Sequence, residues 1–411
     1  MSEAAPPRPP EKGPCDLLVH GTGGIMGTVE GADALAISDG KVLAAGTEAE
    51  LRARYEPAHQ VDAHGLLGLP GFVDAHTHPA FAAGRAQEFD WRAEGLDYLE
   101  IAARGGGIHS SVRAVREASE EELTACVAAH FRRMQRHGTT TCEAKSGYGL
   151  SLEDERKSLR AIHAAAAATG MQVRATCLAA HMVPLEHQES PDRYLDLLCE
   201  EILPAIREEQ LAEAADVFIE QGAFDLAAGR RYLERAKELG YGLRVHADQF
   251  HALGGVQLAV ELEAESVDHL EVLSDAGLEA LAMSRKVHAG LLPAVPHFLR
   301  QADDAPARRL IAAEVPYFVA TDFNPGSSYT ASLPEAAHFA RIRLRLSSAE
   351  ALHGITHGAA CSLGLGQTKG RLDPGFDADF VLCELPDLAH LGYGFGENPV
   401  QRVFVAGREL R

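Results

Sequence analysis

Two histidines one residue apart follow an apolar run near the start of the chain, in the segment Gly71-Phe-Val-Asp-Ala-His76-Thr-His78. Side chains at positions i and i+2 of a β-strand point to the same face, so His76 and His78 can converge on one cation. Neutral imidazole is a good ligand for zinc, iron and related metals. A His-x-His pair by itself is more often a pair of unrelated histidines, so the metal hypothesis depends on where the pair lies in the fold.

Later apolar runs also end in residues that can bind a metal or move a proton, namely His246, His269 and Asp322. Taken singly, each is as readily explained as a satisfied buried histidine or a helix-capping aspartate. If the runs are strands of a barrel, their ends surround one axis, and His76, His78, His246 and Asp322 could then hold one cation. Nitrogen and oxygen ligands with a position left open for water are typical of a catalytic metal site.

The elements that must position these residues alternate between short apolar runs and amphipathic helical stretches. This alternation is typical of βα units and a parallel sheet. Eight strands are predicted, at residues 71–75, 139–144, 172–178, 216–220, 242–246, 266–269, 286–292 and 317–322. Eight units predict an α/β fold of the TIM-like (β/α)8 barrel type, whose active sites lie at the carboxyl ends of the strands. A doubly wound open sheet is the alternative, but no glycine-rich dinucleotide fingerprint follows the first strand.

Segments near both ends of the chain have a shorter, β-like pattern, including a hairpin signal at Asp39-Gly40 and strand-like runs at 378–383 and 403–407. We therefore predict a small β-sandwich-like domain formed from residues 15–65 plus 368–411. The barrel is expected to occupy residues 66–367, and a disordered, proline-rich tail residues 1–14.

Composition limits the kind of partner. The chain has 411 residues, 46% of them hydrophobic, and a net charge of −21. That charge opposes binding to nucleic acid or anionic membranes, which favours a small-molecule partner. The seven cysteines include no CxxC pair, and the N-terminus lacks an apolar signal region, so a cytoplasmic protein without a membrane span is expected.

Several motifs together resemble a known family. The histidine pair on the first strand, the histidines of the fifth and sixth strands and the aspartate of the eighth resemble the amidohydrolase superfamily. The flanking stretches resemble its imidazolonepropionase family along nearly the whole chain: Pro70–His78, Arg104–Ile108, Gly138–Thr141, Lys145–Leu150, Ala180-His181, His246–Asp248, Asp268-His269 and Ala320–Ser328. The runs Lys145-Ser-Gly-Tyr-Gly-Leu150 and Thr321-Asp-Phe-Asn-Pro-Gly-Ser-Ser328 are the most specific to that family.

The resemblance implies a set of roles. The implied metal ligands are His76, His78, His246 and Asp322, holding one divalent ion, zinc or iron. The implied substrate-binding residues are Arg85, Tyr148, His181, Gln249, Asn324, Gly326 and Ser327. The family often has glutamate where this chain has Gln249, and glutamine cannot take up a proton in the useful range, so we assign Gln249 to binding. No lysine ends the fourth strand at Phe218-Ile-Glu220, which favours one metal over a carbamate-bridged pair.

The implied reaction is hydrolytic ring opening of 4-imidazolone-5-propanoate to N-formimidoyl-L-glutamate, in histidine degradation. Asp322 is expected to move the proton, His269 to stabilise the oxyanion, and Arg85 to bind the propionate group. A homodimer is also implied. Two alternatives stay open: a deaminase or other cyclic-amide hydrolase with the same ligands, and a metal-free binding or scaffold protein that kept the barrel.

Overall fold

The structure is a computed structural model that describes residues 12–96, 100–101 and 104–410. Its centre is a sheet of eight parallel strands in the order β13-β12-β11-β10-β9-β8-β7-β6. The strands are β6 (Phe72–Asp74), β7 (Thr139–Lys145), β8 (Gln172–Ala180), β9 (Ala214–Ile219), β10 (Gly242–Ala247), β11 (Ser266–His269), β12 (His288–Leu291) and β13 (Tyr317–Val319). The predicted (β/α)8 architecture is therefore confirmed, and each predicted strand overlaps an observed one.

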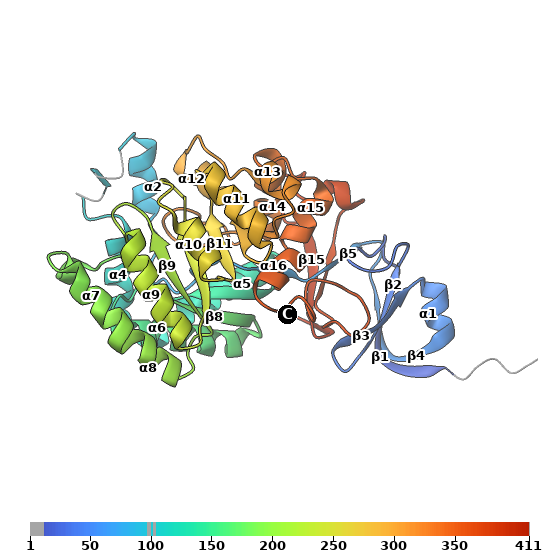
Figure 1. The fold of residues 1–411 in the computed structure, drawn as a ribbon. Coiled ribbons are helices and arrows are strands. Elements are labelled where there is room, and N and C mark those ends of the chain that lie inside the picture. Colours follow the sequence, from blue (N-terminus) through green and yellow to red (C-terminus); the bar gives the residue numbers. More distant parts are fainter. Residues whose placement is uncertain (1–11, 97–99, 102–103, 411) are drawn as a thin grey trace, which may run out of the picture.

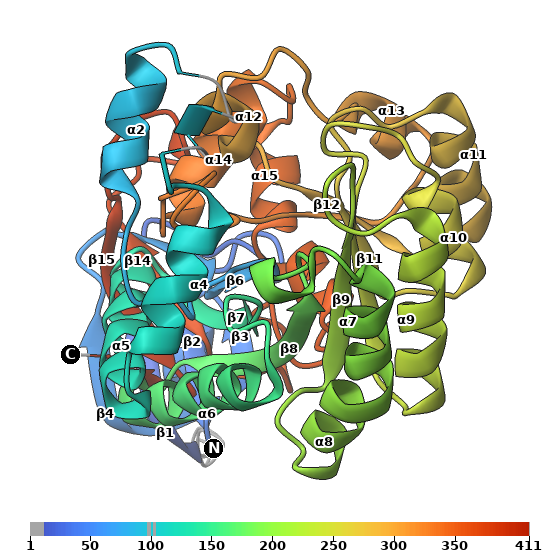
Figure 2. The ribbon, with the colours of Figure 1, turned by 90° about the vertical axis from the view of Figure 1, so that its left-hand side faces the viewer.

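Helices connect the strands and surround them, as Figure 2 shows. They are α2 (Ala86–Ala93), α4 (Ile108–Glu117), α5 (Glu120–Arg136), α6 (Leu152–Thr169), α7 (Pro191–Leu197), α8 (Leu203–Glu208), α9 (Leu226–Glu238), α10 (Gly255–Glu261), α11 (Asp275–Ser284), α12 (Ala294–Leu299), α13 (Ala307–Ala312), α14 (Leu333–Ile342), α15 (Ser348–Gly354) and α16 (His357–Ser362). Local signals start several of them. Ser119 and Glu122 form a capping box at α5, and Ser347 and Glu350 form one at α15.

The first and last strands of the barrel join beyond their carboxyl ends. The Asp322 N–H donates to the His76 carbonyl (3.1 Å), and the His78 N–H donates to the Phe323 carbonyl (3.0 Å). The buried Asp74 carboxylate accepts hydrogen bonds from the Thr321 amide (3.1 Å) and hydroxyl (2.6 Å). The same backbone contacts that close the barrel therefore set His76 and His78 beside Asp322.

Strands β6 and β13 are shorter than predicted. The first ends at Asp74, before His76, and the last ends at Val319, before Asp322. Asp322 has a φ of 50° and His269, the last residue of β11, a φ of 84°, values that extended strands do not adopt. The backbone turns at these residues, so their side chains are aimed into the barrel mouth.

A smaller lobe lies beside the barrel (Figure 1). One sheet has the order β3-β2-β1-β4, formed by β1 (Gly13–His20), β2 (Ala34–Ser38), β3 (Lys41–Gly46) and β4 (Tyr55–Asp62), with helix α1 (Glu48–Arg54). A second sheet has the order β16-β15-β14-β5, formed by β5 (Leu67–Pro70), β14 (Phe380–Cys383), β15 (Val400–Val405) and β16 (Arg408–Glu409).

Apolar side chains from both ends of the chain share one core cluster in this lobe, including Leu17, Ile37, Phe380 and Phe404. The Phe380 and Phe404 rings stack with centroids 4.2 Å apart. This shared core supports the proposed domain of residues 15–65 plus 368–411, although β5 pairs with β14 from outside those bounds. The predicted tail, 1–14, lies outside the described residues except for 12–14, and β1 begins at Gly13.

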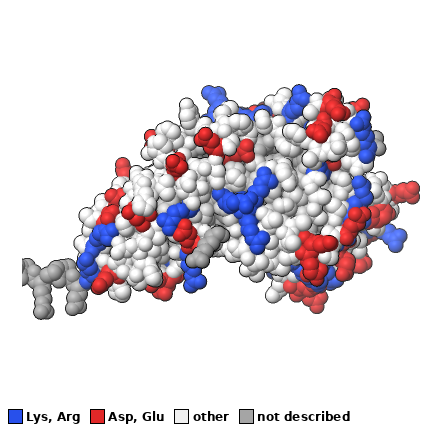
Figure 3. Space-filling view, turned by 180° about the vertical axis from the view of Figure 1, so that it is seen from behind, with Lys and Arg blue, Asp and Glu red and all other residues white. Residues whose placement is uncertain are grey.

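Charged groups of both signs are interspersed over the face shown in Figure 3, with one group of basic side chains where the two lobes meet. Within the described part of the chain, no helix is both long and apolar enough to cross a membrane.

Candidate active site

Three imidazole rings and one carboxylate converge at the mouth of the barrel. The Nε2 atom of His78 lies 3.3 Å from the Nε2 of His76 and 3.4 Å from that of His246. The Asp322 Oδ1 lies 3.2 Å from His78 Nε2 and 3.5 Å from His76 Nε2. All four residues are at most 3% exposed. The structure thus brings together the four residues that the sequence suggested as metal ligands.

The opposite nitrogens of two of these rings are held by buried carboxylates. His76 Nδ1 lies 2.7 Å from Asp268 Oδ2, and His246 Nδ1 lies 3.0 Å from Asp216 Oδ1. A carboxylate at Nδ1 fixes the Nδ1–H tautomer and leaves the Nε2 lone pair free for a metal. Asp268 and Asp216 therefore orient the two rings.

The pKa values of three of the four proposed ligands favour the protonation states that bind a metal. Burial holds the pKa of His78 well below its usual range and lowers that of His246 to about 4, so both rings are neutral at pH 7. Burial opposes ionisation of Asp322, but the imidazole rings of His76 and His78 beside its carboxylate hold its pKa well below normal. His76 differs. Burial and Lys145 disfavour its charged form, but Asp268 and Asp322 raise its pKa to about 9, so a cation must displace that proton.

The donor set itself indicates a cation. Asp322 Oδ1 is buried and has no hydrogen-bond partner, although it faces two imidazole nitrogens. Buried polar atoms without partners are rare and costly. Three neighbouring imidazole nitrogens, two of them beside a carboxylate oxygen without a hydrogen-bond partner, match the ligands of a catalytic zinc or iron site, so the residues fit a divalent metal.

A buried lysine beneath this cluster was not predicted. Lys145, at the end of β7, is 0% exposed, and its Nζ lies 2.7 Å from Asp216 Oδ2 and 2.8 Å from Glu143 Oε1. Glu143 also accepts a hydrogen bond from the Thr77 amide (3.3 Å), and its carbonyl accepts one from the Thr77 hydroxyl (2.6 Å). These hydrogen bonds and ion pairs fix the position of Asp216, which orients His246. They also fix Thr77, the residue between His76 and His78.

These buried charged residues could have been identified from the sequence, because charged side chains two positions apart interrupt otherwise apolar strands. Glu143 and Lys145 differ by two positions, as do Asp74 and His76, so each pair shares the face that points into the barrel.

The loop after β13 holds Asp322 from its other side. The Asn324 Nδ2 donates to Asp322 Oδ2 (2.9 Å), and its Oδ1 accepts from the amides of Gly326 (2.7 Å) and Ser327 (2.8 Å). Ser327 Oγ lies 3.3 Å from Asp322 Oδ2. Asn324 and Ser327 thus occupy one carboxylate oxygen of Asp322 and leave the other facing the histidines. Substrate binding by these residues stays a prediction.

Two ring-bearing residues predicted to bind substrate line the mouth next to His78. The His181 ring is stacked on His78 with centroids 5.4 Å apart, and the Tyr148 ring lies 6.2 Å from His78 and 5.5 Å from His181. Burial and the neighbouring His246 lower the pKa of His181 to about 3. As a neutral ring whose Nδ1–H donates to the Gly147 carbonyl (3.0 Å), His181 offers its Nε2 as an acceptor.

His269 lies beside the rings of His76 and His246, and Gln249 follows the end of β10. Gln249 is 6% exposed, and its amide forms no hydrogen bond with the residues that the structure describes. The His269 ring lies 5.3 Å from that of His246, and its Nδ1 is 3.5 Å from Glu271 Oε1. Both side chains thus keep polar atoms available to a ligand.

Arg85 precedes helix α2 and is not a surface cation, since its side chain is 14% exposed. Its Nε lies 3.3 Å from the Glu88 Oε2. Its guanidinium presses on the backbone of Gly326, where a Cβ atom would lie only 1.7 Å from Nη2. The predicted pair Arg85 and Gly326 is thus in direct contact, and the glycine is required by the position of the arginine.

We expect Gly326→Ala to raise KM for a carboxylate-bearing substrate about 10–100-fold, because the methyl group displaces the Arg85 guanidinium, which can form charge-assisted hydrogen bonds to a carboxylate. Metal content should not change. Steady-state kinetics measure the effect, and Gly84→Ala is the control, because its Cβ would meet only ordinary contacts at 3.6 Å and beyond. Equal KM values for the two variants would contradict this account.

A histidine outside the metal cluster makes stability depend on pH. Burial lowers the pKa of His288 to about 4, although a hydrogen bond with the Glu265 carbonyl opposes the shift. The unfolded chain, with an ordinary histidine pKa near ~6.5, then binds more protons than the folded chain between about pH 4 and 6.5. The stability that His288 contributes is present above the unfolded pKa and is lost as pH falls through this window.

We expect the melting temperature to fall from pH 6.5 to pH 4.5 and to fall less steeply in His288→Gln. Thermal unfolding across this pH range tests it. The same pH dependence in both proteins would show that His288 does not contribute.

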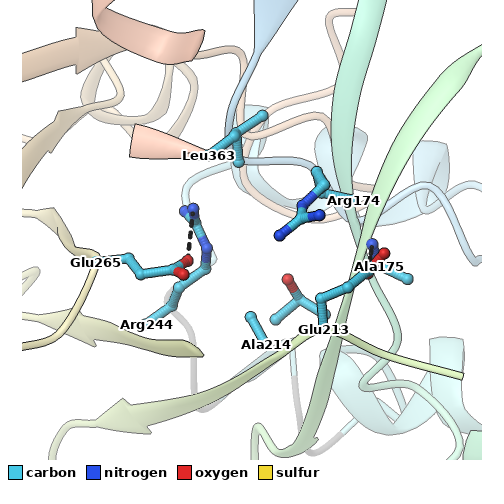
Figure 4. A pocket seen from close by; sticks show the side chains of 8 residues that line it. Arg174, Ala175, Glu213, Ala214, Arg244, Glu265 and Leu363 are labelled. Atoms are coloured by element: carbon cyan, nitrogen blue, oxygen red, sulfur yellow. Dashed lines mark hydrogen bonds and ion pairs between the residues drawn. The ribbon is translucent and has the colours of Figure 1, made fainter. Parts of the chain in front are cut away.

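The opposite end of the barrel holds a small cavity (Figure 4). Arg244 is 1% exposed and donates to the Ala75 and Ser362 carbonyls, and its Nη2 lies 3.4 Å from Glu265 Oε2. The Arg174 side chain points into the same cavity. This end contains none of the predicted site residues, and Arg244 closes the base of the barrel interior.

Solved structures of two deaminases share this fold. An adenosine deaminase from Xanthomonas campestris with bound zinc matches with a TM-score of 0.73 over 97% of this chain and 93% of its own, at 21% identity. The guanine deaminase of E. coli matches with a TM-score of 0.69 over 92% and 91%, at 17% identity. At these identities the likeness concerns the fold alone. The family model described as "Amidohydrolase family" matches residues 67–410, and the chain belongs to that family.

The curated relatives give its place within the family. The imidazolonepropionase of Rubrobacter xylanophilus is 46% identical over 376 residues, which cover 91% of this chain and 89% of the relative. That of Porphyromonas gingivalis is 40% identical over 386 residues, covering 94% and 91%. Within the amidohydrolases, the chain groups with the imidazolonepropionases.

Proposed function

We propose that this protein is a metal-dependent hydrolase that opens the ring of 4-imidazolone-5-propanoate to give N-formimidoyl-L-glutamate. The observation that carries the proposal is the cluster of the Nε2 atoms of His76, His78 and His246, with the unpartnered Oδ1 of Asp322 beside the first two, in a barrel whose relatives are imidazolonepropionases. The proposed ligands are His76, His78, His246 and Asp322, with one zinc or iron ion.

A divalent cation bound there would supply a Lewis acid that makes water nucleophilic at neutral pH. Water oxygen adds to the ring carbonyl carbon, and Asp322 accepts the water proton. The bond from that carbon to the ring nitrogen breaks, and the proton moves from Asp322 to the departing nitrogen. His269 stabilises the oxyanion in between. Because Gln249 cannot exchange a proton, its role is to hold the ring by hydrogen bonds.

The remaining predicted residues hold the substrate. Arg85 is the proposed partner of the propionate carboxylate, since a planar guanidinium matches a carboxylate with two parallel hydrogen bonds. Tyr148 and His181 form the wall beside His78 against which a flat ring can pack. Asn324, Gly326 and Ser327 are proposed to contact the substrate through the loop that they form.

The test follows the ultraviolet absorbance of freshly prepared imidazolone propionate with purified protein, before and after chelation. We expect consumption that stops on chelation and returns with zinc or iron, and mass spectrometry should identify the formimidoyl product. Protein that contains metal but consumes none of this substrate would overturn the proposal. A panel of amino-substituted rings and other cyclic amides would then be tested.

Two further features are proposed. The seven cysteines are free thiols, which supports a reducing, cytoplasmic location. A homodimer is supported by exposed apolar side chains at the end of α14 and in the segment before β15 that packs on this helix, where Ile342 is 65%, Tyr393 76% and Phe395 63% exposed. Sedimentation should give twice the chain mass of 44.0 kDa.

A further inference from the structure

Two guanidinium groups converge on one backbone position at the barrel mouth. The Arg85 Nη2 contacts the backbone of Gly326. Arg92 lies seven residues later, near the end of α2, and donates from both Nη1 and Nη2 to the Gly326 carbonyl, each at 3.3 Å. Arg92 lacks any distinctive sequence motif and was not predicted to have a role. Its remaining N–H groups are not taken by other described residues.

The charge around this pair is unbalanced among the described residues. The buried carboxylate next to the guanidiniums is that of Glu88, which is 5% exposed. It lies 3.3 Å from Arg85 Nε and also accepts from the Gly107 amide (2.9 Å) and the Ser110 hydroxyl (3.2 Å). Among the ion pairs within residues 12–96 and 104–410, one carboxylate shared in this way leaves one positive charge of the two arginines without a partner of its own. A monoanionic ligand would neutralise it.

The environment of Arg92 supports a role in binding an anion. Burial, and then the charge of Arg85, lower its pKa, as expected for two cations held close together in a partly desolvated site. Its guanidinium also lies over the Phe298 ring, 5.6 Å from the centroid, which fixes the plane of the fork. A fixed guanidinium loses little freedom when it binds a carboxylate.

The pair is connected to the reacting end of the site through the backbone. The Gly326 amide, on the other side of the residue that both arginines contact, donates to Asn324 Oδ1 (2.7 Å), and Asn324 donates to Asp322 (2.9 Å). These hydrogen bonds hold the arginine-binding residue Gly326 at a fixed distance from Asp322, so a ligand bound between the arginines has a defined position relative to Asp322.

We propose that Arg92 is a specificity-determining residue that forms, with Arg85, a paired-guanidinium subsite for the carboxylate of the substrate. The inference rests on the proposed function for the identity of that substrate, an azole ring bearing a propionate. Arg92 makes the site select carboxylate-bearing rings over neutral ones. Glu88, which is fixed by the Gly107 amide and the Ser110 hydroxyl, holds Arg85 in place for the same purpose.

The experiment measures binding to the metal-loaded, full-length protein by calorimetry, so that it does not depend on turnover. The probes are imidazole-4-propanoate and the neutral 4-ethylimidazole, which share the ring but differ in the carboxylate. In Arg92→Gln, Kd for the propanoate should rise about 10–100-fold, while Kd for 4-ethylimidazole should change less than about 3-fold. Arg92→Lys should fall in between, because it keeps the charge but loses the planar fork.

Arg341→Gln is the matched control. Its guanidinium also donates to two backbone carbonyls, those of Ala389 and Leu391, but it lies on α14 and faces away to the loop there. It should leave both Kd values unchanged. Circular dichroism confirms that each variant is folded.

The possible results distinguish a role in carboxylate binding from a role in supporting the loop. Equal weakening of both probes in Arg92→Gln would show that Arg92 only supports the loop, and unchanged propanoate binding would show that it does not contact the carboxylate. Either result overturns the inference, as does failure of the wild-type protein to bind the propanoate more tightly than 4-ethylimidazole. If the wild type binds the propanoate through Arg92 but does not consume imidazolone propionate, the proposed reaction is wrong and the subsite stands.

Discussion

Replacing Asp322 with asparagine is expected to lower kcat by at least about 10³-fold, because the residue is both the proposed metal ligand and the proposed proton carrier. The surrounding hydrogen bonds explain why the similar shape of asparagine does not rescue it. Asp322 Oδ2 accepts from the Asn324 amide at 2.9 Å and lies 3.3 Å from Ser327 Oγ. The amide oxygen of a new asparagine must take that position, since an NH₂ group there would face the Nδ2 donor of Asn324.

The NH₂ group of the new side chain would then face His76 and His78, where Asp322 Oδ1 now lies 3.5 and 3.2 Å from their Nε2 atoms. An amide NH₂ has no lone pair for a cation. Metal content, measured by elemental analysis, should therefore fall together with kcat. Asp275→Asn is the control, because Asp275 is exposed and pairs only with Arg309 at the surface.

Adding excess metal separates the two roles of Asp322. If turnover stays low in Asp322→Asn after metal content is restored, the loss reflects proton transfer. Turnover above about a tenth of the wild-type rate in the metal-restored variant would remove Asp322 from the proton-transfer step, and a proton acceptor would have to be sought elsewhere in the mouth.

The fold could be predicted because the physical signal is local. Strands buried on both faces are mostly apolar, and the helices between them carry one apolar stripe, so the alternation can be read from the chain. The (β/α)8 barrel then follows, and with it the expectation that His76, His246 and Asp322 meet at one end. The backbone turn at Asp322 could not be predicted, because it depends on contacts across the closing seam.

The groups that support the ligands were harder to find from sequence. Asp216 reaches both Lys145 and His246, residues 71 and 30 positions away, and no local pattern states which strands are neighbours in register. Arg92 looks like any polar residue of a surface helix until the loop after β13 is placed beside it. The resemblance to a family supplied the ligands and the substrate loop, and its motifs include Lys145, but it assigned no role to Lys145, Asp216 or Arg92.

Replacing Lys145 with methionine is expected to lower the free energy of unfolding by roughly 3–5 kcal/mol, because it removes one partner of a fully buried ion network. The Lys145 Nζ lies between Glu143 and Asp216, and all three side chains are 0% exposed. Burial lowers the pKa of Lys145, but the charges of Asp216 and Glu143 raise it by more, so Lys145 stays protonated. Its positive charge offsets the repulsion between the two carboxylates. Methionine has a similar length but leaves two buried carboxylates without it.

The metal site should respond as well. Asp216 is held by Lys145 through Oδ2 while it accepts the Nδ1–H of His246, so a rotated Asp216 releases that ring. Chelator competition should therefore show faster metal loss in Lys145→Met. The surface pair of Lys41 and Asp377, 2.6 Å apart with Lys41 47% exposed, provides the control, and Lys41→Met should cost no more than about 1 kcal/mol.

A second substitution tests whether charge or packing causes the loss. Glu143→Gln added to Lys145→Met removes one of the two unpaired carboxylates, so the double variant should be more stable than Lys145→Met alone. Chemical denaturation of the four proteins of this cycle gives the coupling energy between the two residues. If the free energy of unfolding of the double variant falls by the sum of the two single losses, Lys145 acts only by filling space. Asp216 and His246 would then retain the metal without help from Lys145.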